Sequence, residues 1–261
     1  MSDYEHIILR EDKRVAVLTL NNPEKRNPLT DETKTEMISA LGVVAQNDNI
    51  RALVITGTGP VFCAGGDVKK IGKELTPDEI KDMMLRSQRL LKVFINLEKP
   101  VIAAVNGDAF GMGCNLALAT DFVIASEKAR FSEVFVKLGV SPDFGALYFL
   151  PRLVGLWKSR ELAYLGDIVG AQEALRIGLV YRVVPHQELE NEAMALAGRL
   201  AGMPTKAIGR MKRLLNSSFD MTLEELLEEE IKNQIILTQT EDHREGIRAL
   251  LEKRKPKFKG K

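Results

Sequence analysis

The sequence has few of the residues that build metal clusters or disulfide frameworks. Only two of its 261 residues are cysteines, Cys63 and Cys114, which excludes a disulfide scaffold and a multi-cysteine zinc site. Its three histidines lie too far apart along the chain to suggest a metal cluster. We therefore expect no metal ion, and we expect the protein to belong to a reducing compartment.

Long apolar runs are also absent. No run approaches the roughly 18–20 residues that span a bilayer, and the acidic start MSDYEHIIL lacks the layout of a signal peptide. Hydrophobic residues make up 45% of the chain and charged residues 28%, which is typical of a globular protein rather than a disordered one. The composition predicts a soluble, cytoplasmic protein with no membrane partner.

The net charge is close to zero, with 37 basic and 36 acidic residues, which argues against a general nucleic-acid coat. The charge is uneven along the chain, because the last nine residues (253–261) hold six basic side chains and no acidic one. Residues 1–252 carry the other 31 basic residues and all 36 acidic ones, a net charge of −5. The tail is either a solvated terminus or a clamp for an anionic group.

Strand-like and helical patterns alternate over the first half of the chain. Thr30 can cap a helix over residues 32–46. Short apolar runs, several of them rich in β-branched residues, predict strands. Alternating strands and helices imply an α/β architecture, in which helices cover a sheet. The predicted strands are 7–9, 15–20, 52–56, 101–105, 122–125 and 180–184.

Capping boxes mark two further helix starts. Thr76 and Thr222 are each followed by a glutamate three residues later, and Pro77 stands at the first helical position of the earlier one. Beyond about residue 141 the pattern is mostly helical, and no linker or internal repeat divides the chain. The sequence predicts an α/β core over residues 1–195 and a helical C-terminal subdomain over 196–261.

Familiar nucleotide-binding and nucleophile motifs are missing. Gly111, Met112 and Gly113 look like the start of a dinucleotide-binding fingerprint, but Leu116 stands where its third glycine belongs. No P-loop, GxSxG or HExxH motif occurs either. Rossmann-type binding and covalent nucleophilic catalysis therefore have little support.

Two glycine-rich loops each follow a predicted strand and precede a helix. Their sequences are FCAGGD (62–67) and NGDAFGMGCN (106–115). Such loops leave backbone N–H groups pointing outward at the positive end of a helix. Two N–H groups that converge on one oxygen form an oxyanion hole, which can stabilise an enolate. The alternative is that these glycines only allow tight turns and close packing.

Together with their flanks, the loops resemble the crotonase (enoyl-CoA hydratase/isomerase) superfamily, closest to its epoxyphenylacetyl-CoA isomerase and enoyl-CoA isomerase branch. The resemblance implies a crotonase-type spiral of ββα units with a helical C-terminal subdomain. It also implies an acyl-CoA substrate, no cofactor beyond the CoA moiety of that substrate, and a homotrimer or hexamer. The matching stretches are LTLNNPEKRNPL (18–29), ITGTGPVFCAGGDV (55–68), KPVIAAVNGDAFGMGCNLALATDFVIAS (99–126), ARFSEVFVKLGVSPDFG (129–145), FLPRLVG (149–155), ALRIGLVYRVVP (174–185) and REGIRALLEKRKPKFKGK (244–261).

The resemblance also implies roles for individual residues. The oxyanion donors would be the backbone N–H groups of Gly66 and Met112. Lys69 would face the CoA phosphates, although it could equally be a solvated helix residue. The other expected contacts with the CoA substrate are Lys25, Arg26, Ala64, Gly65, Asp67, Val68, Gly111, Asn115, Phe135 and Phe144, together with Phe258 of an adjacent subunit.

Carboxylates decide which reaction the resemblance implies. Hydratases of the family use two glutamates, but Asn115 and Phe135 occupy those positions here. Asp143 remains, where the isomerase branch has an aspartate. One base is enough to isomerise a 3-enoyl thioester to the 2-enoyl form, because it can remove a proton at C2 and return it at C4. We therefore expect an isomerase with Asp143 as the proton shuttle and Glu133 as the reserve candidate.

Several alternatives remain open. Ser141, Pro142 and Asp143 read equally as the N-cap and first two positions of a helix, where an aspartate is favoured without any catalytic role. If Asp143 is catalytic, we expect Phe135, Phe144 and Leu147 to raise its pKa by desolvation. Asn115 would bond either the substrate or backbone groups.

Other functions compete with isomerisation. One is hydration with a non-standard acid/base set, and another is a non-catalytic CoA-thioester or RNA-binding module. A cluster of basic residues lies at helical spacing, but no aromatic residues interleave with it, so we do not expect a nucleic-acid partner. The cluster consists of Lys206, Arg210, Lys212 and Arg213.

Overall fold

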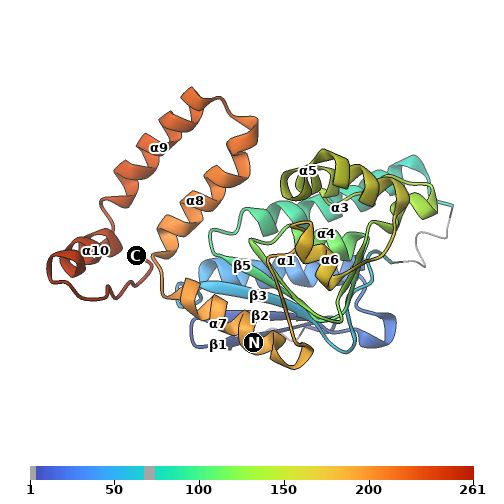
Figure 1. Ribbon diagram of the computed structural model, residues 1–261, viewed down its shortest axis with the longest axis horizontal. Coiled ribbons are helices and arrows are strands. Elements are labelled where there is room, and N and C mark those ends of the chain that lie inside the picture. The colour runs from blue at the N-terminus through green and yellow to red at the C-terminus, as the bar shows by residue number, and fades with distance from the viewer. Residues whose placement is uncertain (1–3, 68–73) are drawn as a thin grey trace.

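Two sheets form the centre of the chain in the computed structural model, which describes residues 4–67 and 74–261 (Figure 1). The larger has six strands in the order β1-β2-β3-β5-β7-β10. Its first pair is antiparallel and the other neighbours are parallel. The strands are β1 (Ile7–Asp12), β2 (Val15–Leu20), β3 (Ala52–Gly57), β5 (Val101–Val105), β7 (Phe122–Ser126) and β10 (Arg182–Val184).

The smaller sheet has the order β4-β6-β8-β9 and is built from very short strands. β4 and β6 pair in parallel, as do β6 and β8, while β9 is antiparallel to β8. Each strand of the large sheet from β3 to β7 is followed within a few residues by one of this small sheet. The four strands are β4 (Val61–Cys63), β6 (Asp108–Phe110), β8 (Arg130–Ser132) and β9 (Val169–Gly170).

Helices cover both faces of the large sheet. α7 packs on one face, and α1, α3 and α4 lie on the other side. The α-helices are α1 (Asp31–Gln46), α3 (Pro77–Ile95), α4 (Met112–Leu118), α5 (Ala146–Leu165), α6 (Ala171–Arg176), α7 (Leu189–Ala201), α8 (Thr205–Ser217), α9 (Leu223–Leu237) and α10 (Glu241–Leu251). Short 3-10 turns are η1 (Pro23–Lys25), η2 (Val134–Leu138), η3 (His186–Glu188) and η4 (Ser218–Asp220).

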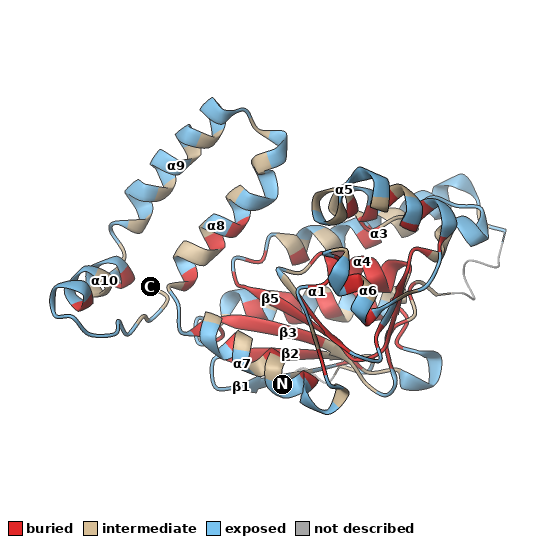
Figure 2. Ribbon diagram, viewed as in Figure 1, coloured by how far each residue is buried: buried red, intermediate tan, exposed pale blue. Residues whose placement is uncertain are grey.

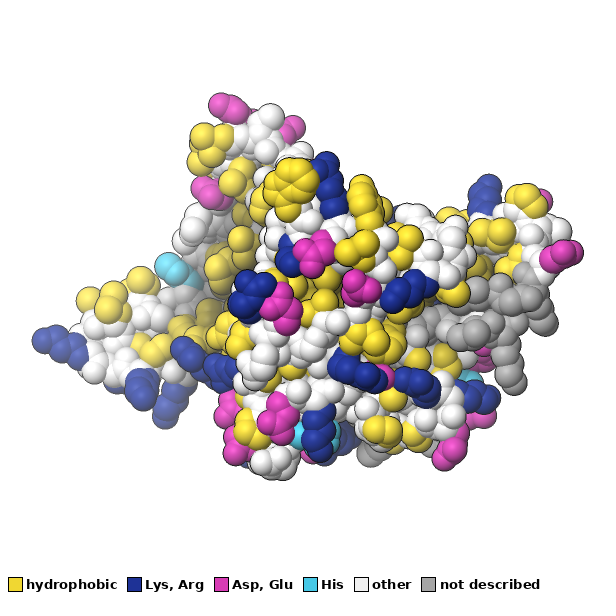
Figure 3. Space-filling view, turned by 45° about the vertical axis from the view of Figure 1, so that its right-hand side comes forward, with side chains coloured by type: hydrophobic (Ala, Val, Ile, Leu, Met, Phe, Trp, Pro, Cys, Tyr) yellow, Lys and Arg dark blue, Asp and Glu magenta, His cyan; other side chains and the backbone are white. Residues whose placement is uncertain are grey.

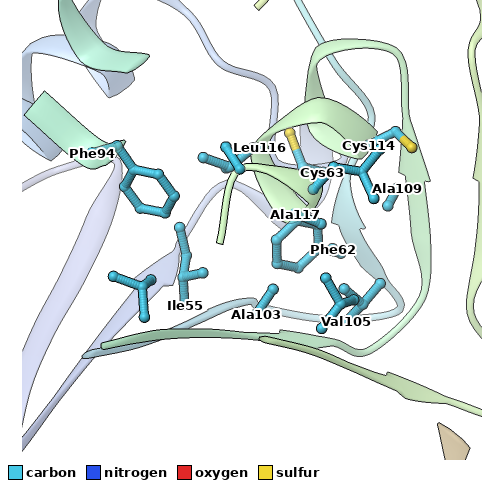
Figure 4. Close-up of a cluster of buried hydrophobic side chains, with 14 of the residues drawn as sticks. Ile55, Phe62, Cys63, Phe94, Ala103, Val105, Ala109, Cys114, Leu116 and Ala117 are labelled. Atoms are coloured by element: carbon cyan, nitrogen blue, oxygen red, sulfur yellow. The ribbon is translucent and has the colours of Figure 1, made fainter. Parts of the chain in front are cut away.

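The core follows from the alternation of side chains along the strands, since neighbouring residues point to opposite faces. Leu18 and Ile55 join the larger cluster with α1, α3 and α4, while Val17 and Val54 join a second cluster under α7. Buried residues therefore concentrate in and around the sheets (Figure 2). The side chains of Phe62, Phe94 and their neighbours pack closely together, and the glycine-rich loops start from this packed layer (Figure 4).

The last three helices form an arm (205–261) that extends away from the sheets (Figure 1). α9 has no buried residue, although it carries apolar side chains. Its exposed large hydrophobics are Leu223, Leu227, Ile231, Ile235 and Ile236. Figure 3 shows hydrophobic side chains exposed on this arm. The expected boundary between residues 195 and 196 falls inside α7, which covers the sheet.

Most predicted elements are present, and both capping boxes are confirmed at Thr76 and Thr222. The α/β class is confirmed as well. The small sheet was not predicted, because strands of two or three residues give no periodic signal. Among the described residues, no helix has the length and apolar character needed to cross a membrane.

Candidate active site

The small sheet brings the two glycine-rich loops together. β4 and β6 are parallel neighbours, with Cys63 opposite Ala109, so the loops that leave their C-terminal ends run side by side. A Cβ on Gly65 would lie 2.8 Å from the Phe110 carbonyl oxygen, and Gly65 has a φ of +104°. Only glycine accepts both that backbone conformation and that approach.

The backbone N–H groups of Gly66 and Met112 lie on neighbouring stretches of these loops. The Gly65 Cβ position is 3.6 Å from the Met112 nitrogen, and Met112 is the first residue of α4. The first loop is fixed by its own hydrogen bonds, since Leu29 N–H donates to the Gly65 carbonyl at 2.8 Å and Ala64 N–H donates to that of Arg26 at 3.0 Å. Within the described residues, no acceptor occupies the Gly66 or Met112 N–H. Both groups remain available to a ligand oxygen.

A charged cluster stands beside these loops. Asp108, at the start of β6, accepts a hydrogen bond from Arg26 at 2.8 Å and two from Arg130, at 2.7 and 2.9 Å. Both arginine side chains are about half exposed, while Asp108 is buried. Asp108 thus holds two guanidinium groups at the surface. Of the other expected CoA contacts, Lys25 lies in the adjacent turn, Asp67 ends the described part of the first loop, and Val68 and Lys69 lie outside the described residues.

Asp143 lies in an irregular loop and not in the first turn of a helix. The expected N-cap at Ser141 is wrong, because α5 begins at Ala146 with Gly145 as its N-cap. Phe144 and Gly145 both have positive φ, +50° and +79°, which no right-handed helix can include. The helix-capping alternative for Asp143 is therefore excluded.

Burial governs the electrostatics of Asp143. Desolvation raises the pKa of its carboxyl to about 6, while the nearby Lys34 ammonium acts in the opposite direction. Its Oδ1 atom is buried and has no hydrogen-bond partner in the part of the chain that the structure describes. Phe144 is buried next to it, whereas Leu147 is 52% exposed, so the expected contribution of Leu147 to the desolvation stays a prediction. A carboxyl with this pKa is mostly ionised at neutral pH and can still accept and release a proton.

Glu133 is the second buried carboxyl of the site. It follows β8 directly and is 2% exposed. Desolvation raises its pKa to about 7, and the charge of Asp143 adds to that rise. Cys114 and Asn115 lie close enough to favour its ionised form, but neither makes a hydrogen bond of normal geometry with either carboxyl oxygen. Sequence reasoning placed Glu133 only in reserve.

Asn115 links α4 to the Asp143 loop. Its Nδ2 donates to the Asp143 backbone carbonyl at 3.0 Å, which satisfies a backbone group, as one of the two alternatives expected. Its Oδ1 is buried without a partner. Phe135 packs near Gly111, whose Cβ position is 3.6 Å from the phenyl ring. The structure therefore brings Gly111, Asn115 and Phe135 together with Asp143 around the start of α4.

Comparison with known proteins identifies the family. A sequence model described as enoyl-CoA hydratase/isomerase matches residues 10–261. The chain belongs to this family. A 1,2-epoxyphenylacetyl-CoA isomerase of Escherichia coli K12 is 39% identical over 98% of this chain and 99% of its own length. A crotonyl-CoA hydratase of Syntrophomonas wolfei is 38% identical over 98% of each chain.

Solved structures agree on the fold. A crystal structure of an enoyl-CoA hydratase/isomerase from Cupriavidus metallidurans CH34 has a TM-score of 0.93 and 34% identity, and it covers 100% of this chain and 98% of its own. The protein is therefore an enzyme of the enoyl-CoA hydratase/isomerase family. Its relatives include both an isomerase and a hydratase, so similarity alone does not choose the reaction.

Lys34 is the residue that sequence reasoning missed at this enzyme site. It belongs to α1 and is only 4% exposed. Its Nζ lies 3.0 Å from an Asp31 carboxylate oxygen and 3.2 Å from the Ser87 hydroxyl, on α3. The spacing of Asp31 and Lys34 is common on exposed helix faces, so only the packing of α1 against α3 reveals the burial.

Both cysteines are buried, Cys63 at the end of β4 and Cys114 inside α4 rather than at tight turns. Burial raises the pKa of the Cys63 thiol to about 12 and that of Cys114 well above its usual range. Figure 4 shows both sulfur atoms among apolar side chains. Neither thiol is activated as a nucleophile.

The basic tail is held against its own chain. Arg51 donates to the carbonyl of Phe258 at 2.8 Å, and Asp242 accepts from the N–H groups of Lys259 and Gly260, at 2.6 and 2.8 Å. The Phe258 ring lies 3.6 Å from the Cβ position of Gly246, in α10. Its expected contact with the CoA of an adjacent subunit stays a prediction.

The basic cluster on α8 is not one open surface. Lys212 is buried and its Nζ lies 2.9 Å from an Asp121 carboxylate oxygen. Arg213 pairs with Glu98 at 3.4 Å and Arg210 donates to Asn233 at 3.1 Å. Because these three side chains bond partners within the chain, the cluster gives no support to RNA binding.

Proposed function

We propose that this enzyme isomerises a 3-enoyl-CoA, or a related ring acyl-CoA, to the 2-enoyl form. The observation that carries the proposal is a buried Asp143 carboxyl near the start of α4, where the Met112 backbone N–H has no acceptor among the described residues. The positions that hold the two hydratase glutamates are occupied here by Asn115 and Phe135. Neither side chain can take a proton from water.

The proposed reaction begins at C2 of the thioester. Asp143 removes a proton from C2, and the electron pair moves onto the thioester oxygen as an enolate. The N–H groups of Gly66 and Met112 stabilise that oxygen, and loss of one such donor typically costs about 2.7–4 kcal/mol in the barrier. A proton then arrives at C4, so that the double bond moves from C3–C4 to C2–C3.

The pKa of Asp143 suits this work. A general base is most effective when its pKa lies near the working pH, because it is then both ionised and basic enough. At about 6, the Asp143 pKa leaves most of the carboxyl ionised at neutral pH. An exposed aspartate has an ordinary pKa near 3.9, which is lower by roughly two pKa units, and it would therefore be a weaker base.

The CoA moiety would bind along the first glycine loop. Ala64, Gly65 and Asp67 offer the backbone there, and Arg26, held by Asp108, offers a cation for a phosphate group. No cofactor beyond the CoA is needed, because the reaction only moves a proton and a double bond.

Assembly as a homotrimer or hexamer would bury the apolar side chains of α9. Sedimentation at micromolar concentration tests this, and a monomer would contradict it.

Hydration of a 2-enoyl-CoA is the second candidate. It is favoured by one observation, the second buried carboxyl of Glu133, because hydration needs both an acid and a base. A non-catalytic CoA-thioester or RNA-binding module is the remaining alternative.

The ultraviolet absorbance of the conjugated thioester separates these functions. We expect absorbance to rise with a 3-enoyl-CoA, as the conjugated product forms. A fall with a 2-enoyl-CoA would mean hydration, and no change with either substrate would favour a binding role.

A further inference from the structure

Four polar oxygens at the site are buried without any hydrogen-bond partner among the described residues. They are Oε1 and Oε2 of Glu133, Oδ1 of Asn115 and Oδ1 of Asp143. Burying an unpaired carboxylate costs far more than burying a paired one. Glu133 is the carboxyl with both oxygens buried and unpaired among the described residues, and the one-base mechanism gives it no role.

The groups around Glu133 explain why its pKa is raised. From α4, the Cys114 thiol and the Asn115 amide face it, and from the loop before α5 the Asp143 carboxyl adds negative charge. Lys34, on α1, attracts the charge of Asp143. Glu133 itself makes no ion pair with any described residue. A buried carboxyl without a cation, beside a second carboxyl, holds its proton while the other ionises.

Glu133 is also anchored in place. It directly follows β8, whose Ser132 carbonyl accepts the Gly111 N–H at 2.8 Å and whose Ser132 hydroxyl donates to the Gly166 carbonyl at 2.9 Å. Gly111 is the N-cap of α4. The same backbone hydrogen bond therefore positions both Glu133 and the loop that presents the Met112 N–H.

We infer that Glu133 is a second catalytic residue, which in its neutral form protonates C4 of the dienolate after Asp143 has taken the proton from C2. This rests on the proposed isomerase function. The bond from the Glu133 oxygen to its proton breaks as the C4–H bond forms, and the C3–C4 electron pair supplies the new bond. The oxygen lone pair of the enolate re-forms the C1 carbonyl, and the C1–C2 π pair moves to form the C2–C3 double bond. Asp143 ends protonated and Glu133 ionised, and proton exchange with solvent resets the pair.

Isotope transfer tests this inference. A 3-enoyl-CoA carrying two deuterium atoms at C2 is converted in ordinary water in a single turnover, and the product is analysed for deuterium at C4. If two residues carry the reaction, the proton at C4 comes from Glu133. Less than about a tenth of the deuterium removed from C2 should then appear at C4. Transfer of most of the deuterium to C4 in the wild-type enzyme would show that Asp143 acts alone, and would overturn the inference.

Glu133→Gln keeps the size of the side chain but cannot supply the proton. We expect its kcat to fall by about 10²–10⁴-fold, and its residual turnover to carry deuterium from C2 to C4. Glu11→Gln, at an exposed position on β1, serves as the matched control and should keep the wild-type rate. Equal kcat values for Glu133→Gln and the wild type would also overturn the inference.

The pH profile gives a readout that a merely structural role would not change. An acid must be protonated, so wild-type activity should fall as pH rises through the Glu133 pKa, and Glu133→Gln should lose that alkaline limb. An unaltered limb would contradict the role of Glu133. If the wild-type enzyme does not isomerise a 3-enoyl-CoA at all, the proposed function itself fails, which is a different result from an isomerase that does not need Glu133.

Discussion

Replacing Gly65 by alanine should damage the site through the contact between the two glycine loops. The added Cβ would meet the Phe110 carbonyl oxygen at 2.8 Å, against the 3.4 Å of an ordinary contact, and that oxygen belongs to the backbone of β6. The loops must then move apart by several tenths of an ångström. A φ of +104° adds about 1–3 kcal/mol of backbone strain for a side chain.

The backbone strain and the displacement of an N–H donor should change different measured quantities. The strain should lower the melting temperature by roughly 2–4 °C for each kcal/mol lost. Activity should fall further, because displacement of one N–H donor removes about 2.7–4 kcal/mol of transition-state stabilisation, or about 10²–10³-fold in rate. We therefore expect kcat/KM for an acyl-CoA substrate to fall by about 10²-fold or more.

Gly139→Ala is the matched control for this substitution. Gly139 also has a positive φ, +71°, but a Cβ there meets nothing within 4 Å. Melting temperatures by circular dichroism and kcat/KM are measured for both variants. If Gly65→Ala keeps a kcat/KM within about threefold of Gly139→Ala, the close approach of the loops does not position the oxyanion donors, and the reasoning is refuted.

Three further predictions concern charge. Because Asp143 acts in its ionised form and has a pKa of about 6, activity should fall as pH drops through 6; a flat profile between pH 5 and 7 would contradict this. Arg26→Ala should raise KM for the acyl-CoA by several-fold with little change in kcat, and the difference should shrink in high salt. Lys212→Ala should lower the unfolding free energy by about 2–3 kcal/mol in urea denaturation, less than for a fully buried pair because Asp121 is 22% exposed; an unchanged midpoint would show that this pair contributes nothing.

Regular elements were accessible from the sequence because their signals are local. The β2 and β5 strands follow from apolar runs, and the starts of α3 and α9 follow from capping boxes whose hydrogen bonds form within four residues. The small sheet escaped prediction, since β4 and β6 have three residues each. Its strands pair segments far apart in the sequence, which leaves no local signal.

The candidate site was accessible only in part. The resemblance led to Asp143, but its helical environment was predicted wrongly because Phe144 takes a positive φ that its residue type does not announce. Burial of Glu133 and Lys34 arises from packing between segments far apart in the sequence. Charged residues are seldom buried, so the chain alone gave no reason to place either one inside.

Asp143→Asn tests the central claim most directly. The variant keeps the shape of the side chain and cannot take the proton from C2, so a 3-enoyl-CoA should give no rise in conjugated-thioester absorbance while CoA-thioester binding and the melting temperature stay near the wild-type values. An absorbance that rises at the wild-type rate would show that Asp143 is not the base.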